Sequence, residues 1–230
     1  MSEALPNPEL MRSLGRLVRG LSAVFWGLPV TLVVCFHTAR AESLKLYNLF
    51  PPLACTGLLF YGLWLFGAFQ RQERVWRNAL DCARILALIN FGLSPFLYWW
   101  NRMPDNRFFS IMVITMTISG LVFLGSLNWV LHRLGAMLPD EGLRQETRQF
   151  TALNLNLLGA TLLLGVCYFV LVRIPKLPLY LQAVMLVLDH GSFWLLVLLV
   201  LLPVAMTMAL LWKTKEVILD NVFGRKAEPS

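Results

Sequence analysis

Proton chemistry in this sequence would fall first to Asp189 and its neighbour His190. Asp189 carries the only formal charge in the stretch from Leu177 to Trp212. A carboxylate beside an imidazole can exchange protons, and an ionisable residue in an apolar stretch is a candidate functional site. We therefore consider the two residues as a polar pair at an outer vestibule, against a simpler interpretation in which they cap a helix.

The length of the same stretch favours the capping interpretation. Its 36 residues would form a helix about 54 Å long, whereas a bilayer core is about 30 Å thick. Gly191 lies between Asp189 and Ser192, whose side chains are typical of helix N-caps. We predict a short helix over 179–188 and a membrane helix over 192–212, with a break at Gly191.

Metal or haem binding would need histidine or cysteine ligands that the fold brings together. His37 and His190 are both expected at the outer face and could ligate a haem or a metal ion, but no sequence spacing pairs them. The four cysteines have no short spacing, which excludes a zinc site. Cys35 and Cys55 could form a disulfide in an oxidising compartment or could be small buried side chains, which we favour. We expect no metal and no cofactor.

Asparagine side chains at membrane depth form a second polar set. Asn90 and Asn154 each lie six residues after an arginine, and Asn128 and Asn156 are expected at a similar depth. An amide in hydrocarbon seeks a partner on a neighbouring helix, and each such bond is worth about 0.6–2 kcal/mol. The favoured interpretation is adhesion between helices, and the alternative is a polar lining of a substrate path.

Three arginines recur at spacings of 65 and 64 residues, at Arg19, Arg84 and Arg148, and a leucine follows each of them nine positions later. Each arginine is expected at the cytoplasmic mouth of a helix, where its long side chain can snorkel to the headgroups. The spacing predicts three tandem units of two helices, with chance similarity between apolar helices as the alternative. The units cover residues 17–69, 80–131 and 150–212.

A residue that weakens a helix lies ten or eleven positions after each of these arginines. Eleven residues of helix extend about 16 Å, which places all three near the bilayer centre. Bends at one depth could surround a midplane path, as in transporters, or could serve packing alone, which we favour. The candidate residues for a path or for packing are Pro29, Asn90, Pro95, Asn154 and Gly159.

The elements that carry these residues follow from composition. The chain is 57% hydrophobic and 14% charged, with a mean hydropathy of +0.64, so it is expected to be an integral membrane protein. Its apolar runs do not alternate with a period of two, which predicts an all-α polytopic bundle and excludes a barrel. Six transmembrane helices are predicted, over 17–36, 50–69, 80–100, 108–131, 150–172 and 192–212.

A single membrane domain, 1–230, is predicted to contain these helices. Residues 1–16 would form an amphipathic lead-in on the cytoplasmic headgroups, 17–212 the bundle, and 213–230 a cytoplasmic tail. A helix start is also indicated near Glu141, which would extend the fifth helix into the cytoplasm.

Basic residues concentrate on alternate connections. Fourteen of the 20 lysines and arginines lie in the two ends and in the second and fourth loops, which places both termini in the cytoplasm of a bacterial-type inner membrane. The net charge of +7 then indicates contact with anionic lipid headgroups rather than with nucleic acid. One alternative remains: the first helix, with the triplet from Ala39 to Ala41, resembles a cleavable signal peptide.

No nucleotide-binding glycine loop, metalloprotease motif or serine hydrolase motif is present, and charged groups are nearly missing from the spans. The protein is therefore not expected to be an enzyme or a proton pump. The favoured function is a non-catalytic subunit or scaffold of a membrane complex. The alternative is a small permease or channel-like transporter with a path between the bent odd-numbered helices.

Overall fold

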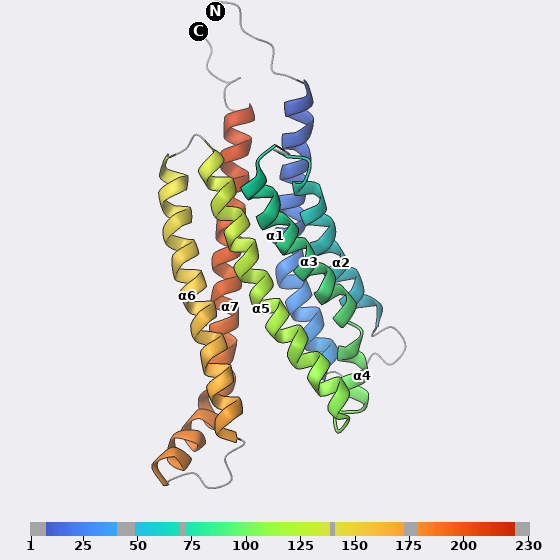
Figure 1. The fold of residues 1–230 in the computed structure, drawn as a ribbon, viewed down its shortest axis with the longest axis vertical. Helices are drawn as coiled ribbons and strands as arrows, with labels where there is room; N and C mark the ends of the chain where they lie inside the picture. Colours follow the sequence, from blue (N-terminus) through green and yellow to red (C-terminus); the bar gives the residue numbers. More distant parts are fainter. Residues whose placement is uncertain (1–7, 41–48, 70–71, 139–140, 173–178, 224–230) are drawn as a thin grey trace, which may run out of the picture.

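The chain folds into a bundle of long helices (Figure 1). The computed structural model describes residues 8–40, 49–69, 72–138, 141–172 and 179–223, and each regular element among them is a helix. The all-α prediction is confirmed. The helices are α1 (Pro8–Arg40), α2 (Phe50–Phe66), α3 (Arg74–Leu93), α4 (Phe96–Arg102), α5 (Arg107–Met137), α6 (Glu141–Val172) and α7 (Leu179–Phe223).

Five helical rods are long and apolar enough to cross a membrane, with α3 and α4 counted as one rod, so the protein is an integral membrane protein. The second predicted span, 50–69, is shorter than expected. It corresponds to α2, which has 17 residues and extends about 26 Å, a little less than a typical bilayer core. The count of six helices thus holds, and within the described residues five of them reach the full spanning length.

The third rod is interrupted at Pro95, as the sequence indicated. A proline lacks the N–H that would bond to the carbonyl four residues earlier, here that of Phe91. The Ser94 hydroxyl donates to this carbonyl instead, at 2.9 Å. The chain therefore turns from α3 into α4 without leaving the carbonyl unpaired.

The predicted boundary at residue 16, between a lead-in over 1–16 and the first membrane helix, lies within one helix, because α1 runs without interruption from Pro8 to Arg40. The reason is a row of leucines that continues across it. Leu14 packs against the core, and Leu17 and Leu21 are fully buried in it. Because the apolar face of the helix is the same on both sides of residue 16, the sequence contains no signal that would end the helix there. Likewise α7 continues as helix to Phe223, well into the predicted tail.

The predicted break at Gly191 is wrong, since α7 is one helix of 45 residues. A glycine weakens a helix by only about 1 kcal/mol, whereas releasing backbone groups in an apolar medium costs several. The chain keeps its helical bonds and changes direction instead. Figure 1 shows the first turns of α7, in orange, set at an angle to the rest of the helix. The start of α6 at Glu141 confirms the predicted extension of that helix.

Helices pack mainly in chain order. Interfaces join α1 to α2, α2 to α3, α3 to α5, α5 to α6 and α6 to α7, and α7 closes against α1. Each predicted two-helix unit is thus a packed pair. The equivalence of the units stays a prediction, because the three bend positions differ: Pro95 interrupts its rod, whereas Pro29 and Gly159 lie inside continuous helices.

The α1–α2 interface brings two backbones into close approach. A Cβ added at Gly20 would lie 2.7 Å from the carbonyl oxygen of Gly62, and one added at Gly62 would lie 2.7 Å from Cγ2 of Val24. Both distances are too short for a real side chain. The two glycines therefore allow α1 and α2 to lie closer than any other residue would permit.

Candidate functional site

A buried hydroxyl on α7 joins three helices. The Thr207 Oγ1 accepts hydrogen bonds from Nδ2 of Asn128 on α5 and from Nδ2 of Asn154 on α6, each at 2.9 Å. It donates its own proton to the carbonyl of Pro203 at 2.7 Å. All three polar side chains are fully buried. One hydroxyl thus uses its single donor and both lone pairs to connect α5, α6 and α7.

The junction lies beside Pro203. The proline has no N–H for the carbonyl of Leu199. The Thr161 hydroxyl of α6 lies 3.4 Å from that carbonyl, but its single proton is directed mainly to the carbonyl of Leu157 on its own helix, at 2.8 Å. The carbonyl of Pro203 itself accepts from Asn154 Nδ2 at 3.2 Å as well as from Thr207. The proline therefore frees the carbonyl of Leu199, while Asn154 of α6 bonds to a different backbone oxygen, that of Pro203 itself.

Two of the four asparagines make hydrogen bonds between helices. Asn128 and Asn154 make interhelical bonds, and the amide of Asn128 also reaches the carbonyl of Leu124 on its own helix, at 2.8 Å. Asn90 is buried on α3, but its Oδ1 has no partner among the described residues. Asn156 lies on the exposed side of α6.

The predicted path residues do not line either of the two pockets found in the described part of the chain. Pro29 and Pro95 are half-buried, while Gly159 is exposed and has nothing near the position of an added Cβ. The two pockets that we describe below contain none of the five candidate residues. Their role in a path stays a prediction, without a cavity to support it.

The arginines of the predicted repeat have different surroundings. Arg19 and Arg148 are exposed, as snorkelling would require. Arg84 is half-buried and bonds to the end of α2: its Nε donates to the carbonyl of Leu63 and its Nη2 to that of Trp64, both at 3.2 Å. The last carbonyls of a helix have no intrahelical partner and carry partial negative charge, so a guanidinium stabilises them.

Two further contacts hold Arg84 in place. Its Nη1 forms an ion pair with Asp81 at 3.1 Å, one turn earlier on α3. Its guanidinium also lies over the ring of Trp64, with 5.7 Å between the guanidinium carbon and the ring centroid. Gly67 leaves room for this arrangement, because an added Cβ would lie 1.9 Å from Nη2. The fixed guanidinium links α3 to α2.

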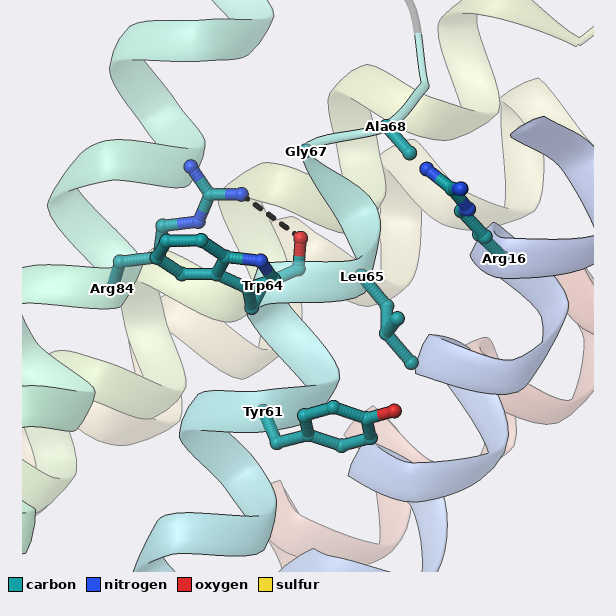
Figure 2. A pocket seen from close by; sticks show the side chains of 7 residues that line it. All are labelled: Arg16, Tyr61, Trp64, Leu65, Gly67, Ala68 and Arg84. Atoms are coloured by element: carbon teal, nitrogen blue, oxygen red, sulfur yellow. Dashed lines mark hydrogen bonds between the residues drawn. The ribbon is translucent and has the colours of Figure 1, made fainter.

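A pocket of about 430 Å³ opens beside this arginine (Figure 2). It lies across the end of α2, with Arg84 on one side and Arg16 of α1 on the other. Its lining residues are Arg16, Tyr61, Trp64, Leu65, Gly67, Ala68 and Arg84. A second pocket of about 200 Å³ shares Gly67 and Arg84 and adds Arg77 and Asp81 of α3. The pocket is therefore basic and partly aromatic.

The remaining predicted chemistry finds little support. The side chains of Asp189 and His190 lie outside the described residues, although their backbone lies within α7. His37 is exposed, and the described residues contain no group of three or more potential metal ligands. Cys35 and Cys55 are half-buried free thiols, so the predicted alternative of a disulfide between them is not formed.

Comparison with known proteins adds no functional assignment. No protein-family model matches the chain, and no curated protein or solved structure matches it either. The residues that sequence reasoning missed are Thr207 and Pro203. Their signal was a proline followed four positions later by threonine inside an apolar run, where the hydroxyl can reach the proline carbonyl.

Replacing Thr207 by valine tests the junction. The substitution keeps the shape but removes the acceptor of two amides, so we expect a loss of about 2 kcal/mol in the free energy of unfolding. Titration with a denaturing detergent in mixed micelles would measure it. Thr115→Val is the matched control, because Thr115 is exposed and bonds within its own helix to Ile111. Equal losses in the two variants would contradict the role of Thr207.

Replacing Arg84 by alanine tests the link between α2 and α3. Three hydrogen bonds are lost, and we expect the free energy of unfolding to fall by about 1–2 kcal/mol. Arg84→Lys keeps the charge but not the planar fork, so it should restore only part of the loss. Arg74→Ala, which removes an exposed charge at the start of α3, is the control and should have little effect. The same unfolding measurement serves all three variants.

Proposed function

We propose that this protein is a non-catalytic subunit or scaffold of a membrane complex. The observation that carries the proposal is the use of the buried polar groups. Asn128, Asn154 and Thr207 bond to one another and to backbone carbonyls, so they hold helices together. A transporter or an enzyme would be expected to direct such groups into a cavity.

The outer faces of the helices fit a role in assembly. Ile111, Ile114 and Ile118 follow one another at helical spacing on α5, and each is nearly half exposed. Only 17% of the most apolar window of α5 is buried inside the chain. Such a face is suited to pack against lipid tails or against the helices of another subunit.

The alternative as a permease has less support. A midplane path would need the bends of the odd-numbered helices to face a common cavity. Gly159 is exposed, and neither described pocket includes Pro29 or Pro95. No contact in the described part of the chain favours transport over assembly.

The proposal includes an orientation, with both ends in the cytoplasm of a bacterial-type inner membrane. Its support is the excess of basic residues at one end, 14 of 20 by sequence position. The start of α1 and the end of α7 lie at the same end of the bundle (Figure 1). In this orientation the exposed arginines of α1, including Arg12 and Arg16, would meet anionic headgroups.

Copurification tests the scaffold role. The tagged full chain, extracted from its own membranes in a mild detergent, is expected to retain a membrane protein at a fixed stoichiometry. The abundance of that partner should fall in cells that lack the chain, because subunits without their scaffold are degraded. Quantitative mass spectrometry measures both effects. A chain that purifies alone, in cells whose other membrane proteins do not change, would contradict the proposal.

Reporter fusions test the orientation. A fluorescent protein that folds only in the cytoplasm is expected to be bright when fused after Ser230 and dark when inserted between Asn101 and Arg107. Alkaline phosphatase, which is active only outside the cytoplasm, should give the opposite pattern. An active phosphatase at Ser230 would show that the charge bias had been misinterpreted.

A further inference from the structure

The pocket beside Arg84 has the charge pattern of an anion site. Arg16 and Arg84 face it from two helices, and no acidic residue lines it. Arg16 is exposed and forms no ion pair within the described residues, so its guanidinium has donors to offer. Figure 2 shows its side chain lying beside Ala68, across the pocket from Arg84.

Arg84 is positioned in advance of any ligand. Its bonds to Leu63, Trp64 and Asp81 use three of its five N–H groups, which leaves two for another acceptor. A side chain already held in place loses little conformational entropy when it binds. The guanidinium of Arg84 therefore provides the fixed half of the site, and the exposed side chain of Arg16 provides the other half.

Negative groups near the site are already neutralised. The carbonyls of Leu63 and Trp64 are bonded by Arg84, and the N–H of Gly67 also bonds to the carbonyl of Trp64, at 3.1 Å. Asp81 pairs with Arg84, while Arg77 adds another positive charge in the adjoining pocket. The net charge of the side chains around the two pockets is therefore positive.

The rest of the lining is apolar and belongs at a membrane surface. Trp64 and Tyr61 are 64% and 56% exposed, and they lie below the two guanidinium groups in Figure 2. Tryptophan and tyrosine are enriched at the headgroup level of membranes. The aromatic side chains continue from the arginines along α2, which is the direction an acyl chain would take from a bound phosphate.

We infer that this pocket binds the headgroup phosphate of one anionic phospholipid between Arg16 and Arg84, with an acyl chain along Tyr61 and Trp64. A volume of about 430 Å³ is sufficient for a glycerophosphate group. Arginine is the side chain best suited to phosphate because its planar fork offers two parallel hydrogen bonds. The inference deepens the proposed contact with anionic headgroups, but it requires neither the scaffold role nor a particular orientation.

Native mass spectrometry of the delipidated full chain in a neutral detergent tests the site. Phosphatidylglycerol and phosphatidylcholine with identical acyl chains are added separately, and the dissociation constant of the first bound lipid is measured. Phosphatidylglycerol should bind about fivefold more tightly, and Arg16→Gln should remove most of this difference. Arg12→Gln is the matched control, because it removes an equal charge one turn away from residue 16, on an exposed residue outside the pocket.

A photoreactive group on the acyl chain of phosphatidylglycerol gives a second measurement. Crosslinks are expected in the peptide from Tyr61 to Ala68 of the wild-type chain, and they should be depleted in Arg16→Gln but not in Arg12→Gln. Equal effects of the two variants on affinity and crosslinking would overturn the site in favour of a general surface charge. Displacement of the lipid by excess inorganic phosphate would overturn it in favour of a free-anion site, and equal binding of the two lipids would overturn it outright.

These outcomes are independent of the scaffold role. Lipid binding in detergent does not require a partner protein, and copurification of a partner does not require the pocket. If phosphatidylglycerol does not crosslink to the end of α2 while a partner still copurifies with the chain, the lipid inference fails and the scaffold proposal stands.

Discussion

The hydroxyl of Thr207 forms three hydrogen bonds, all of them with buried groups of the protein. Within hydrocarbon, a polar atom must find its partner inside the protein, and an unpaired one costs several kcal/mol. Pro203, one turn earlier on α7, leaves the carbonyl of Leu199 without its helical N–H partner. Asn154 of α6 and Asn128 of α5 both donate to the hydroxyl of Thr207, and Asn154 also bonds to the carbonyl of Pro203. Three membrane helices are thus joined at one hydroxyl.

The two halves of the bundle are fastened in different ways, and depth explains the difference. The junction of α5, α6 and α7 uses neutral amides and a hydroxyl. The free-energy cost of burying such groups is offset when they are hydrogen-bonded to one another. The α2–α3 link uses the charged Arg84, which lies where the chain leaves α2 and where side-chain exposure of 23% leaves part of the guanidinium in contact with solvent. A charge of this kind would be far more costly near the bilayer centre. At the end of a helix it also meets the negative pole of the helix dipole.

The sequence predicted the class of the fold and part of its internal bonding. Apolar run lengths defined the membrane helices, and the amides of Asn128 and Asn154 were recognised as adhesive because hydrocarbon offers them no other partner. The role of Arg84 was missed, since one sequence does not reveal that α2 ends beside α3. The break at Gly191 was wrong because helix length was taken to be limited by membrane thickness, whereas a helix can extend beyond the bilayer or change direction. Local signals therefore predicted elements, while partners between helices required the packing itself.

The close approach of Gly20 and Gly62 has a consequence for the basic pocket. Arg16 lies one turn before Gly20 on α1, and Tyr61 and Trp64 lie on either side of Gly62 along α2. The two backbones lie in close contact at the glycines, so the distance between the helices there limits the width of the adjacent pocket. The selectivity of an anion site in this pocket would then depend on Gly20 and Gly62, which do not line it. A larger residue at either glycine would separate the two helices and so change the width of the pocket without altering any residue that lines it.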